Sequence, residues 1–249
     1  MCRLALINYM HSHPLYEALT WNKCRSDPSE ILTGVISGRY EAGMISLIEY
    51  FRNLKDIQLI ESANIHSSGS TLSTLIVSKK SSLSECRTVG VTRHTETTVW
   101  YASRVCRDLG YSLEIIKTNL SEADEILSEF DAALVIGDDA LKIFRTNLRI
   151  LMDVGYEYTA LYRRPPVFAV TVSKNGLRDE DLKAALDRAV AISPNHVDRF
   201  AKENSERLGI PLQIMRAYYS SIMYDYNGAV KRSIEAEHGI FISAPAESR

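Results

Sequence analysis

Small hydroxyl side chains gather in two short stretches of the sequence, residues 66–73 (HSSGSTLS) and residues 92–98 (TRHTETT). Hydroxyl groups and the free N–H groups at the start of a helix bind carboxylates or phosphates without a formal positive charge. Any one of these residues is better explained as a helix cap or a turn residue, but two such clusters favour a site for an anion. Arg93 and His94 would add positive character to the second stretch, although charged loop residues are exposed by default. The candidate binding residues of the two stretches are Ser68, Gly69, Ser73, Thr95, Thr97 and Thr98.

Two histidines lie in an earlier loop, residues 8–13 (NYMHSH). Histidine is the side chain best suited to proton transfer near neutral pH, so His11, which is closer to the preceding apolar run, is a candidate catalytic acid or base. A solvated or helix-packing role explains either histidine equally well. The loop supplies no third metal-ligating side chain, and we expect no metal there.

Gly137, Asp138 and Asp139 directly follow the apolar run of residues 132–136. Ligands of α/β proteins collect at the carboxyl ends of strands, where loops lead into helix N-termini. Asp138 is therefore a candidate catalytic base and Gly137 a candidate binding residue. Helix capping is the safer interpretation for one of the two aspartates.

The composition excludes several classes of protein. The 29 basic residues are balanced by 31 acidic residues, so no positive field is expected to attract nucleic acid. The motifs of dinucleotide-binding, P-loop and α/β-hydrolase proteins are absent. The four cysteines are widely separated, with no C-x-x-C pair, and we expect them to be reduced and mostly buried. The apolar run after Arg3 is too short for a signal peptide or a membrane span, which predicts a cytoplasmic protein without a membrane partner.

Short apolar runs alternate with amphipathic stretches along most of the chain, a pattern typical of an α/β fold with a mostly parallel sheet. One β-α rhythm begins at residue 4 and a second at residue 89, and the last part of the chain reads as helices only. We therefore expect two lobes with a ligand cleft between them. The first lobe is predicted to combine residues 1–84 and 168–249, and the second to comprise residues 85–167.

Six segments at these same loops resemble, in order, a known family. They are LALINYMHSHPLYEAL, AGMISLIEY, SSGSTLSTLIVSK, VGVTRHTETT, LVIGDDAL and DVGYEYTALYRRPPVFAV. They are similar to the menaquinone-biosynthesis family of the futalosine route, and specifically to its chorismate dehydratase branch. The similarity covers most of residues 1–175 and fades in the helical tail.

The resemblance implies the two-lobed fold of type II periplasmic binding proteins, used as a cytoplasmic enzyme. It implies a lyase that removes water from chorismate to give 3-[(1-carboxyvinyl)oxy]benzoate, without metal or organic cofactor. By position, Asn8, His11 and Ser12 would line the first lobe, joined by Ser73. Thr95, Thr97, Thr98 and Asp138 would face them from the second lobe.

Three positions depart from the family pattern. His11 replaces an asparagine, His13 replaces a basic residue, and Glu96 replaces an arginine. A carboxylate at residue 96 would repel an anionic substrate unless it points away from the site.

Two other functions stay open on the sequence. One is the related enzyme that forms 1,4-dihydroxy-6-naphthoate, and the other is a non-catalytic binding protein for a small organic anion. In each case the expected partner is a small anionic molecule, and a homodimer is compatible with the sequence.

Overall fold

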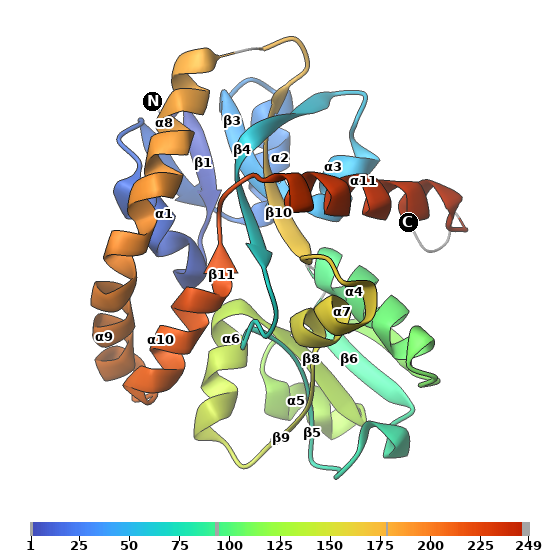
Figure 1. Ribbon diagram of the computed structural model, residues 1–249. Helices are drawn as coiled ribbons and strands as arrows, with labels where there is room; N and C mark the ends of the chain where they lie inside the picture. Colours follow the sequence, from blue (N-terminus) through green and yellow to red (C-terminus); the bar gives the residue numbers. More distant parts are fainter. Residues whose placement is uncertain (1, 93–94, 178, 246–249) are drawn as a thin grey trace. The chain divides into compact units, whose positions relative to one another are not determined.

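The protein is described by a computed structural model that covers residues 2–92, 95–177 and 179–245 (Figure 1). The chain forms two compact units, each built from separate segments. Unit 1 consists of Met1–His66, Arg164–Phe200 and Ile222–Arg249, and unit 2 of Ser67–Arg163 and Ala201–Ser221. Both are α/β, as the apolar runs predict.

Unit 1 contains a six-stranded sheet with the strand order β11-β4-β10-β3-β1-β2. The strand β1 pairs in parallel with β2 and β3, whereas β10 runs antiparallel to β3 and β4. All four residues of β1 are buried, which explains why this strand is a continuous apolar run. The strands are β1 (Leu4–Ile7), β2 (Lys23–Ser26), β3 (Ala42–Ser46), β4 (Ile57–Ser67), β10 (Val167–Lys174) and β11 (Ile222–Met223).

The helices of unit 1 begin where the sequence provides start signals. Pro28 opens the second helix after Asp27, a position that proline favours because its missing N–H is not needed there. Ser46 and Glu49 form a capping box at the third helix, where each side chain accepts a hydrogen bond from the other's main-chain N–H. The helical elements are η1 (Met10–Ser12), α1 (His13–Ala18), α2 (Pro28–Ile36), α3 (Leu47–Arg52), α8 (Glu180–Ile192), η4 (Ser193–His196) and α11 (Gly228–Ser243).

Unit 2 contains a five-stranded sheet with the order β7-β6-β8-β5-β9. The strands are β5 (Thr74–Ser78), β6 (Thr88–Thr92), β7 (Glu114–Thr118), β8 (Ala132–Ile136) and β9 (Arg149–Asp153). Its helical elements are η2 (Leu83–Glu85), α4 (Thr97–Asp108), α5 (Ala123–Glu129), α6 (Gly137–Lys142), η3 (Ile143–Arg145), α7 (Val154–Tyr162) and α10 (Leu212–Ser221). The helix α9 (Val197–Leu208) begins in unit 1 and continues into unit 2. Gly110, with a φ of 83°, follows the end of α4, where glycine readily adopts the left-handed conformation.

The boundaries of the units differ from those of the predicted lobes at three places, the smallest of which is residues 164–167, which belong to unit 1. Residues 67–84 belong to unit 2 because β5 pairs with β8 and β9. Residues 201–221 also belong to unit 2, where Arg145 donates a hydrogen bond to the main-chain oxygen of Leu208 (2.8 Å).

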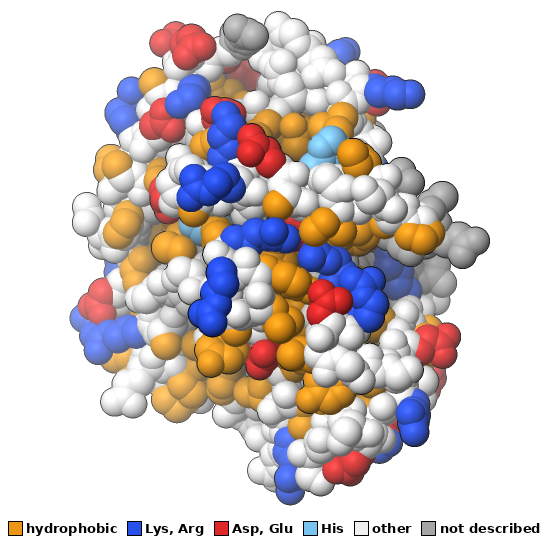
Figure 2. All heavy atoms as spheres, turned by 45° about the vertical axis from the view of Figure 1, so that its right-hand side comes forward, with side chains coloured by type: hydrophobic (Ala, Val, Ile, Leu, Met, Phe, Trp, Pro, Cys, Tyr) orange, Lys and Arg blue, Asp and Glu red, His pale blue; other side chains and the backbone are white. Residues whose placement is uncertain are grey.

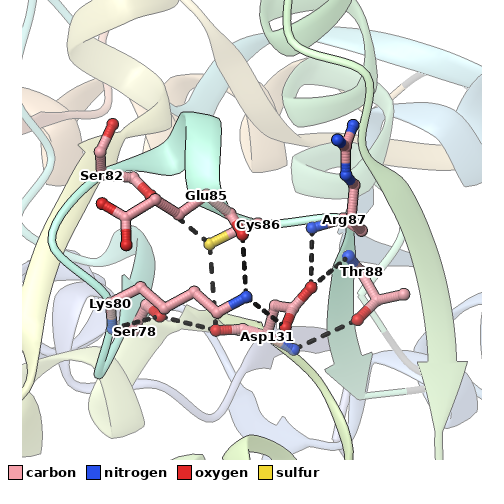
Figure 3. Close-up of polar contacts among 8 residues, drawn as sticks. All are labelled: Ser78, Lys80, Ser82, Glu85, Cys86, Arg87, Thr88 and Asp131. Atoms are coloured by element: carbon pink, nitrogen blue, oxygen red, sulfur yellow. Dashed lines mark hydrogen bonds and ion pairs between the residues drawn. The ribbon is translucent and has the colours of Figure 1, made fainter.

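Asp131 organises the connection between β5 and β6 (Figure 3). Its carboxylate accepts hydrogen bonds from the main-chain N–H of Arg87 (2.7 Å) and from Lys80 (2.5 Å). These bonds lower the pKa of Asp131, the contact with Lys80 having the largest effect. The buried thiol of Cys86 donates to the main-chain oxygen of Ser82. The cluster therefore anchors the segment that leads into β6.

The prediction that all four cysteines are reduced thiols is wrong for two of them. Cys2 and Cys24 form a disulfide, with Cα atoms 5.8 Å apart. The parallel pairing of β1 with β2 places Ala5 opposite Cys24, and the sequence gives no sign of that pairing. Cys86 and Cys106 are free and buried, as predicted, and burial raises the pKa of Cys106 to about 11.

Charges of both signs are present over the face shown in Figure 2, in line with the formal net charge of −2. No helix within the described part of the chain is both long and apolar enough to span a bilayer.

Candidate functional site

In unit 2, the predicted site residues lie along one edge of the sheet, where β6, β8 and β9 end and β5 begins. The strands β6 and β8 are parallel, so both end at this edge, and β5 begins there because Thr74 pairs with Ile136. A hydrogen bond from the N–H of Gly137 to the oxygen of Ser73 (2.8 Å) ties the start of α6 to the start of β5. The predicted residues placed along this edge are Ser68, Gly69, Ser73, Thr95, Thr97, Thr98, Gly137 and Asp138.

The loop before β5 is held by one carboxylate, that of Asp153 at the end of β9. Its oxygens accept hydrogen bonds from the hydroxyl of Ser70 (2.6 Å), the N–H of Thr71 (2.9 Å) and the N–H of Leu72 (2.9 Å). They also accept the N–H of Gly155 (3.0 Å) in the first turn of α7. Asp153 is not among the predicted site residues, although its place between an apolar run and a helix start is a capping signal.

Tight packing adds a second constraint on this loop. A Cβ atom at Gly155 would lie 2.3 Å from Cγ2 of Thr71 and 3.1 Å from the main-chain oxygen of Gly69. Only glycine permits this approach of α7 to the loop. Leu72 has a φ of 55°, a conformation that side-chain-bearing residues rarely adopt. The N–H groups of Leu72 and of the preceding Thr71 both donate to Asp153, which holds the main chain in this conformation.

Two predicted hydroxyls at this edge have no hydrogen-bond partner among the described residues, those of Ser73 and Thr98. Ser73 is 4% exposed and Thr98 is 6% exposed. A hydroxyl has one donor and two acceptor positions, so these groups are available to a ligand. The hydroxyl of Thr95, in contrast, is bonded to that of Thr92 (2.9 Å), which gives it a role within the loop.

The negative charge of Glu96, at the start of α4, is balanced by a neighbouring lysine. Its carboxylate pairs with the ammonium group of Lys117 on β7 (2.5 Å). Glu96 makes no side-chain cap to the first N–H groups of α4, a twelve-residue helix. These N–H groups carry the partial positive charge of the helix N-terminus. The expected conflict between Glu96 and an anionic ligand is therefore relieved by Lys117. Arg93 and His94 lie outside the described residues.

The two aspartates of α6 have different surroundings. Asp139 pairs with Lys142 (2.7 Å) and its side chain is about half exposed. Asp138 is half-buried, and its charge adds to the effect of burial in raising the pKa of Tyr219 on α10. Ile136 is the N-cap residue of α6, so neither aspartate caps the helix. Asp138 remains the candidate base of this edge.

In unit 1, the loop after β1 places its three predicted residues in different settings. Asn8 is exposed at the end of the strand. Ser12 is fully buried, and the one hydrogen of its hydroxyl lies between the main-chain oxygens of Ile7 (2.6 Å) and Tyr9 (2.8 Å). This hydrogen closes the loop, and only the acceptor positions of the hydroxyl are left for a ligand. The binding role of Ser12 stays a prediction.

His11 presents a neutral imidazole at physiological pH. Burial lowers its pKa to about 4, and the neighbouring His13 adds to this effect. The ring of Tyr9 lies beside the imidazole, with a distance of 5.5 Å between ring centroids. A neutral imidazole has one nitrogen that donates a hydrogen bond and one that accepts a proton. His11 thus has the protonation state of a base.

A second histidine in unit 1, His66, belongs to a stretch that the sequence predicts to be a loop. It lies on β4, next to its end, and is 1% exposed. Its Nδ1 is 2.8 Å from Oδ1 of Asn64. The amide of Asn64 donates to main-chain oxygens, including that of Asp225 (2.8 Å), so Oδ1 accepts and Nδ1 of His66 carries the hydrogen.

We expect His66 to make the protein sensitive to acid. Burial lowers the pKa of His66 to about 4, although Asp225 opposes this effect. The stabilisation of the neutral form is complete above the unfolded-state pKa of about 6.5 and is lost as the pH falls towards 4. The free energy of unfolding is expected to fall by as much as about 3 kcal/mol over this range.

Urea unfolding of wild type and His66→Gln at pH 7 and pH 4.5 measures this effect. The His66→Gln variant is expected to lose part of the pH dependence, and His238→Gln, which changes a histidine on α11, to retain it. An unchanged dependence in His66→Gln would show that other groups govern acid unfolding.

No group of three or more His, Cys, Asp or Glu side chains in residues 2–92, 95–177 and 179–245 is arranged to hold a metal ion. The polar groups at the two sheet edges are hydroxyls, main-chain N–H groups, imidazoles and carboxylates. Such groups bind organic anions and transfer protons.

A sequence profile described as menaquinone biosynthesis matches residues 2–236. The chain belongs to this menaquinone biosynthesis family. The match spans both units and contains every predicted site residue. No curated protein sequence gives a significant match.

Solved structures similar to this family member share its fold at low sequence identity. Protein AF1704 from Archaeoglobus fulgidus aligns with a TM-score of 0.72 and 14% identity, covering 97% of each chain. An ABC transporter protein from Parabacteroides distasonis aligns with a TM-score of 0.70 and 16% identity, covering 100% of this chain and 94% of the other. The alkanesulfonate-binding protein SsuA from Xanthomonas axonopodis, bound to MOPS, has a TM-score of 0.67 and 12% identity, with 97% and 92% covered. The predicted fold of periplasmic binding proteins is confirmed.

Proposed function

We propose that the protein is a chorismate dehydratase, a lyase that converts chorismate to 3-[(1-carboxyvinyl)oxy]benzoate and water. The observation that carries the proposal is the match of the chain to the menaquinone biosynthesis family over residues 2–236. The order and spacing of the segments at the strand ends support the dehydratase branch. These segments include LALINYMHSH and LVIGDDAL.

The reaction needs few catalytic groups. A proton leaves one ring carbon, the hydroxyl leaves the neighbouring carbon, and the cyclohexadiene becomes an aromatic ring. No oxidant or reductant takes part, and the released proton and hydroxide combine as water. The protein has to bind a dianion, exclude water and accept a proton.

The residues of unit 1 and unit 2 have separate roles in this proposal. Neutral His11 accepts the ring proton and returns it to the leaving hydroxyl. The hydroxyls of Ser73 and Thr98 and the N–H groups at the start of α4 bind carboxylate. Asp138 assists proton transfer, and Asn8 contacts the substrate.

The proposal is tested by incubating the purified protein with chorismate and following the products by chromatography and mass spectrometry. We expect a product that is lighter than chorismate by one water and has the absorbance of a substituted benzoate. Chorismate that stays unchanged under conditions in which the protein binds it would refute the lyase and favour the binding protein.

A binding protein for a small organic anion is the second candidate. The observation that favours it is the likeness to SsuA, whose structure contains the sulfonate MOPS. Chorismate or another anion would raise the melting temperature of such a protein, and the protein would release the anion unchanged. Conversion of a cyclic futalosine derivative, in place of chorismate, would assign the protein to the related naphthoate-forming enzyme.

A further inference from the structure

A buried polar network in unit 1 joins the end of β4 to the segment that follows β11. Asn64, which is 1% exposed, donates from its side-chain amide to the main-chain oxygens of Tyr224 (3.1 Å) and Asp225 (2.8 Å). The main-chain N–H of Asn64 also donates to the oxygen of Tyr224 (3.0 Å). Because three hydrogen bonds from Asn64 on β4 meet this segment, the main chain at Tyr224 is held firmly in place.

The side chain of Tyr224 continues this network to the loop after β1. Its hydroxyl donates a hydrogen bond to the main-chain oxygen of His11. Tyr224 is 5% exposed, so water does not replace this bond easily. The two residues are 213 positions apart in the sequence, and only the folded unit brings them together.

The loop is therefore held on both sides of the imidazole. On one side, the hydroxyl of Ser12 bonds the oxygens of Ile7 and Tyr9, and the ring of Tyr9 packs beside that of His11. On the other side, Tyr224 holds the carbonyl of His11 itself. The contacts of Ser12 and Tyr9 named here are local, whereas the contact from Tyr224 ties the loop to a segment more than two hundred residues away in the sequence.

We propose that Tyr224 is a positioning residue for His11, and that its hydroxyl holds the imidazole where it exchanges a proton with the substrate. The inference rests on the proposed dehydratase function. Misplacing a catalytic group by about 1 Å lowers a reaction rate by as much as about 100-fold, so one hydrogen bond at this position has a large effect. Tyr224 need not touch the substrate.

The first test measures the kinetics of chorismate dehydration by Tyr224→Phe. We expect kcat to fall about tenfold, the cost of one hydrogen bond, and KM to stay within about twofold. Tyr226→Phe is the matched control, because the hydroxyl of Tyr226 contacts Glu61 at 3.4 Å and not the loop. The control is expected to keep the wild-type kcat.

A double-mutant cycle separates positioning from a general loss of structure. If Tyr224 acts through His11, Tyr224→Phe has no further effect on the residual activity of His11→Gln. An equal loss in both backgrounds, or no loss in either, would overturn the proposal.

The second test does not depend on activity. The imidazole resonances of His11, assigned by comparison with His11→Gln, are expected to shift in Tyr224→Phe and to stay unchanged in Tyr226→Phe, while those of His196 and His238 report that both variants are folded. Unchanged His11 resonances in Tyr224→Phe would refute positioning. Wild-type protein that leaves chorismate intact but shows the His11 shift would refute the dehydratase function and leave the role of Tyr224 standing.

Discussion

His11→Gln is expected to lower kcat for chorismate dehydration by a factor of about 100 to 10,000, the contribution typical of a general acid or base. Burial lowers the pKa of His11 to about 4, so at neutral pH the wild-type imidazole is free to accept a proton. Glutamine keeps a polar side chain in the loop but cannot accept that proton. Steady-state kinetics at pH 7 measure the change.

His196→Gln is the control for this variant, because His196 lies in η4 and not in the loop after β1. It is expected to retain kcat within about threefold. Wild-type kcat in His11→Gln would rule out proton transfer by His11 and direct attention to Asp138.

Asp153→Ala is expected to lower the free energy of unfolding by about 3 kcal/mol, as measured by urea titration. The substitution removes a carboxylate that accepts hydrogen bonds from Ser70, Thr71, Leu72 and Gly155. The N–H groups of Thr71 and Leu72 would lose their partner in a partly buried setting, whereas the N–H of Gly155 would keep its contact with the hydroxyl of Thr74 (3.3 Å). The same change loosens the loop that ends at the candidate binding residue Ser73.

Asp124→Ala serves as the comparison, because Asp124 is an exposed residue in the first turn of α5. It loses only a favourable interaction with the helix dipole, of about 0.5 kcal/mol. If Asp153→Ala and Asp124→Ala had the same small effect, the carboxylate of Asp153 would not be what holds the loop.

The central strands and most helix starts could be predicted from the sequence, because they combine buried apolar runs with local start and stop signals. The run 132–136 and the Asp27-Pro28 pair are examples. The strands β2, β9 and β11 escaped prediction, and all three lie at a sheet edge. The strand β2 has no apolar run, the apolar run of β9 has only three residues, and β11 is only two residues long.

The sequence predicted which loops form the candidate site, but it did not predict the hydrogen bonds that hold these loops. The density of hydroxyls identified Ser73 and Thr98, whose side chains are unpartnered among the described residues. The roles of Asp153 and Tyr224 depend on partners more than eighty residues away in sequence, and no local pattern reports such contacts. The disulfide between Cys2 and Cys24, which are 22 residues apart, was missed because the pairing of β1 with β2 was not predicted.

The place of β10 in the sheet of unit 1 constrains how the protein folds on the ribosome. This strand lies between β3 and β4 (Figure 1), yet its residues, Val167–Lys174, are synthesised about a hundred residues after both. Until it emerges, β3 and β4 each expose an unpaired main-chain edge, which is a template for association with other nascent chains. Slow synthesis across residues 67–166 would prolong that exposure, so the yield of native protein is tied to translation speed and to chaperones that cover strand edges.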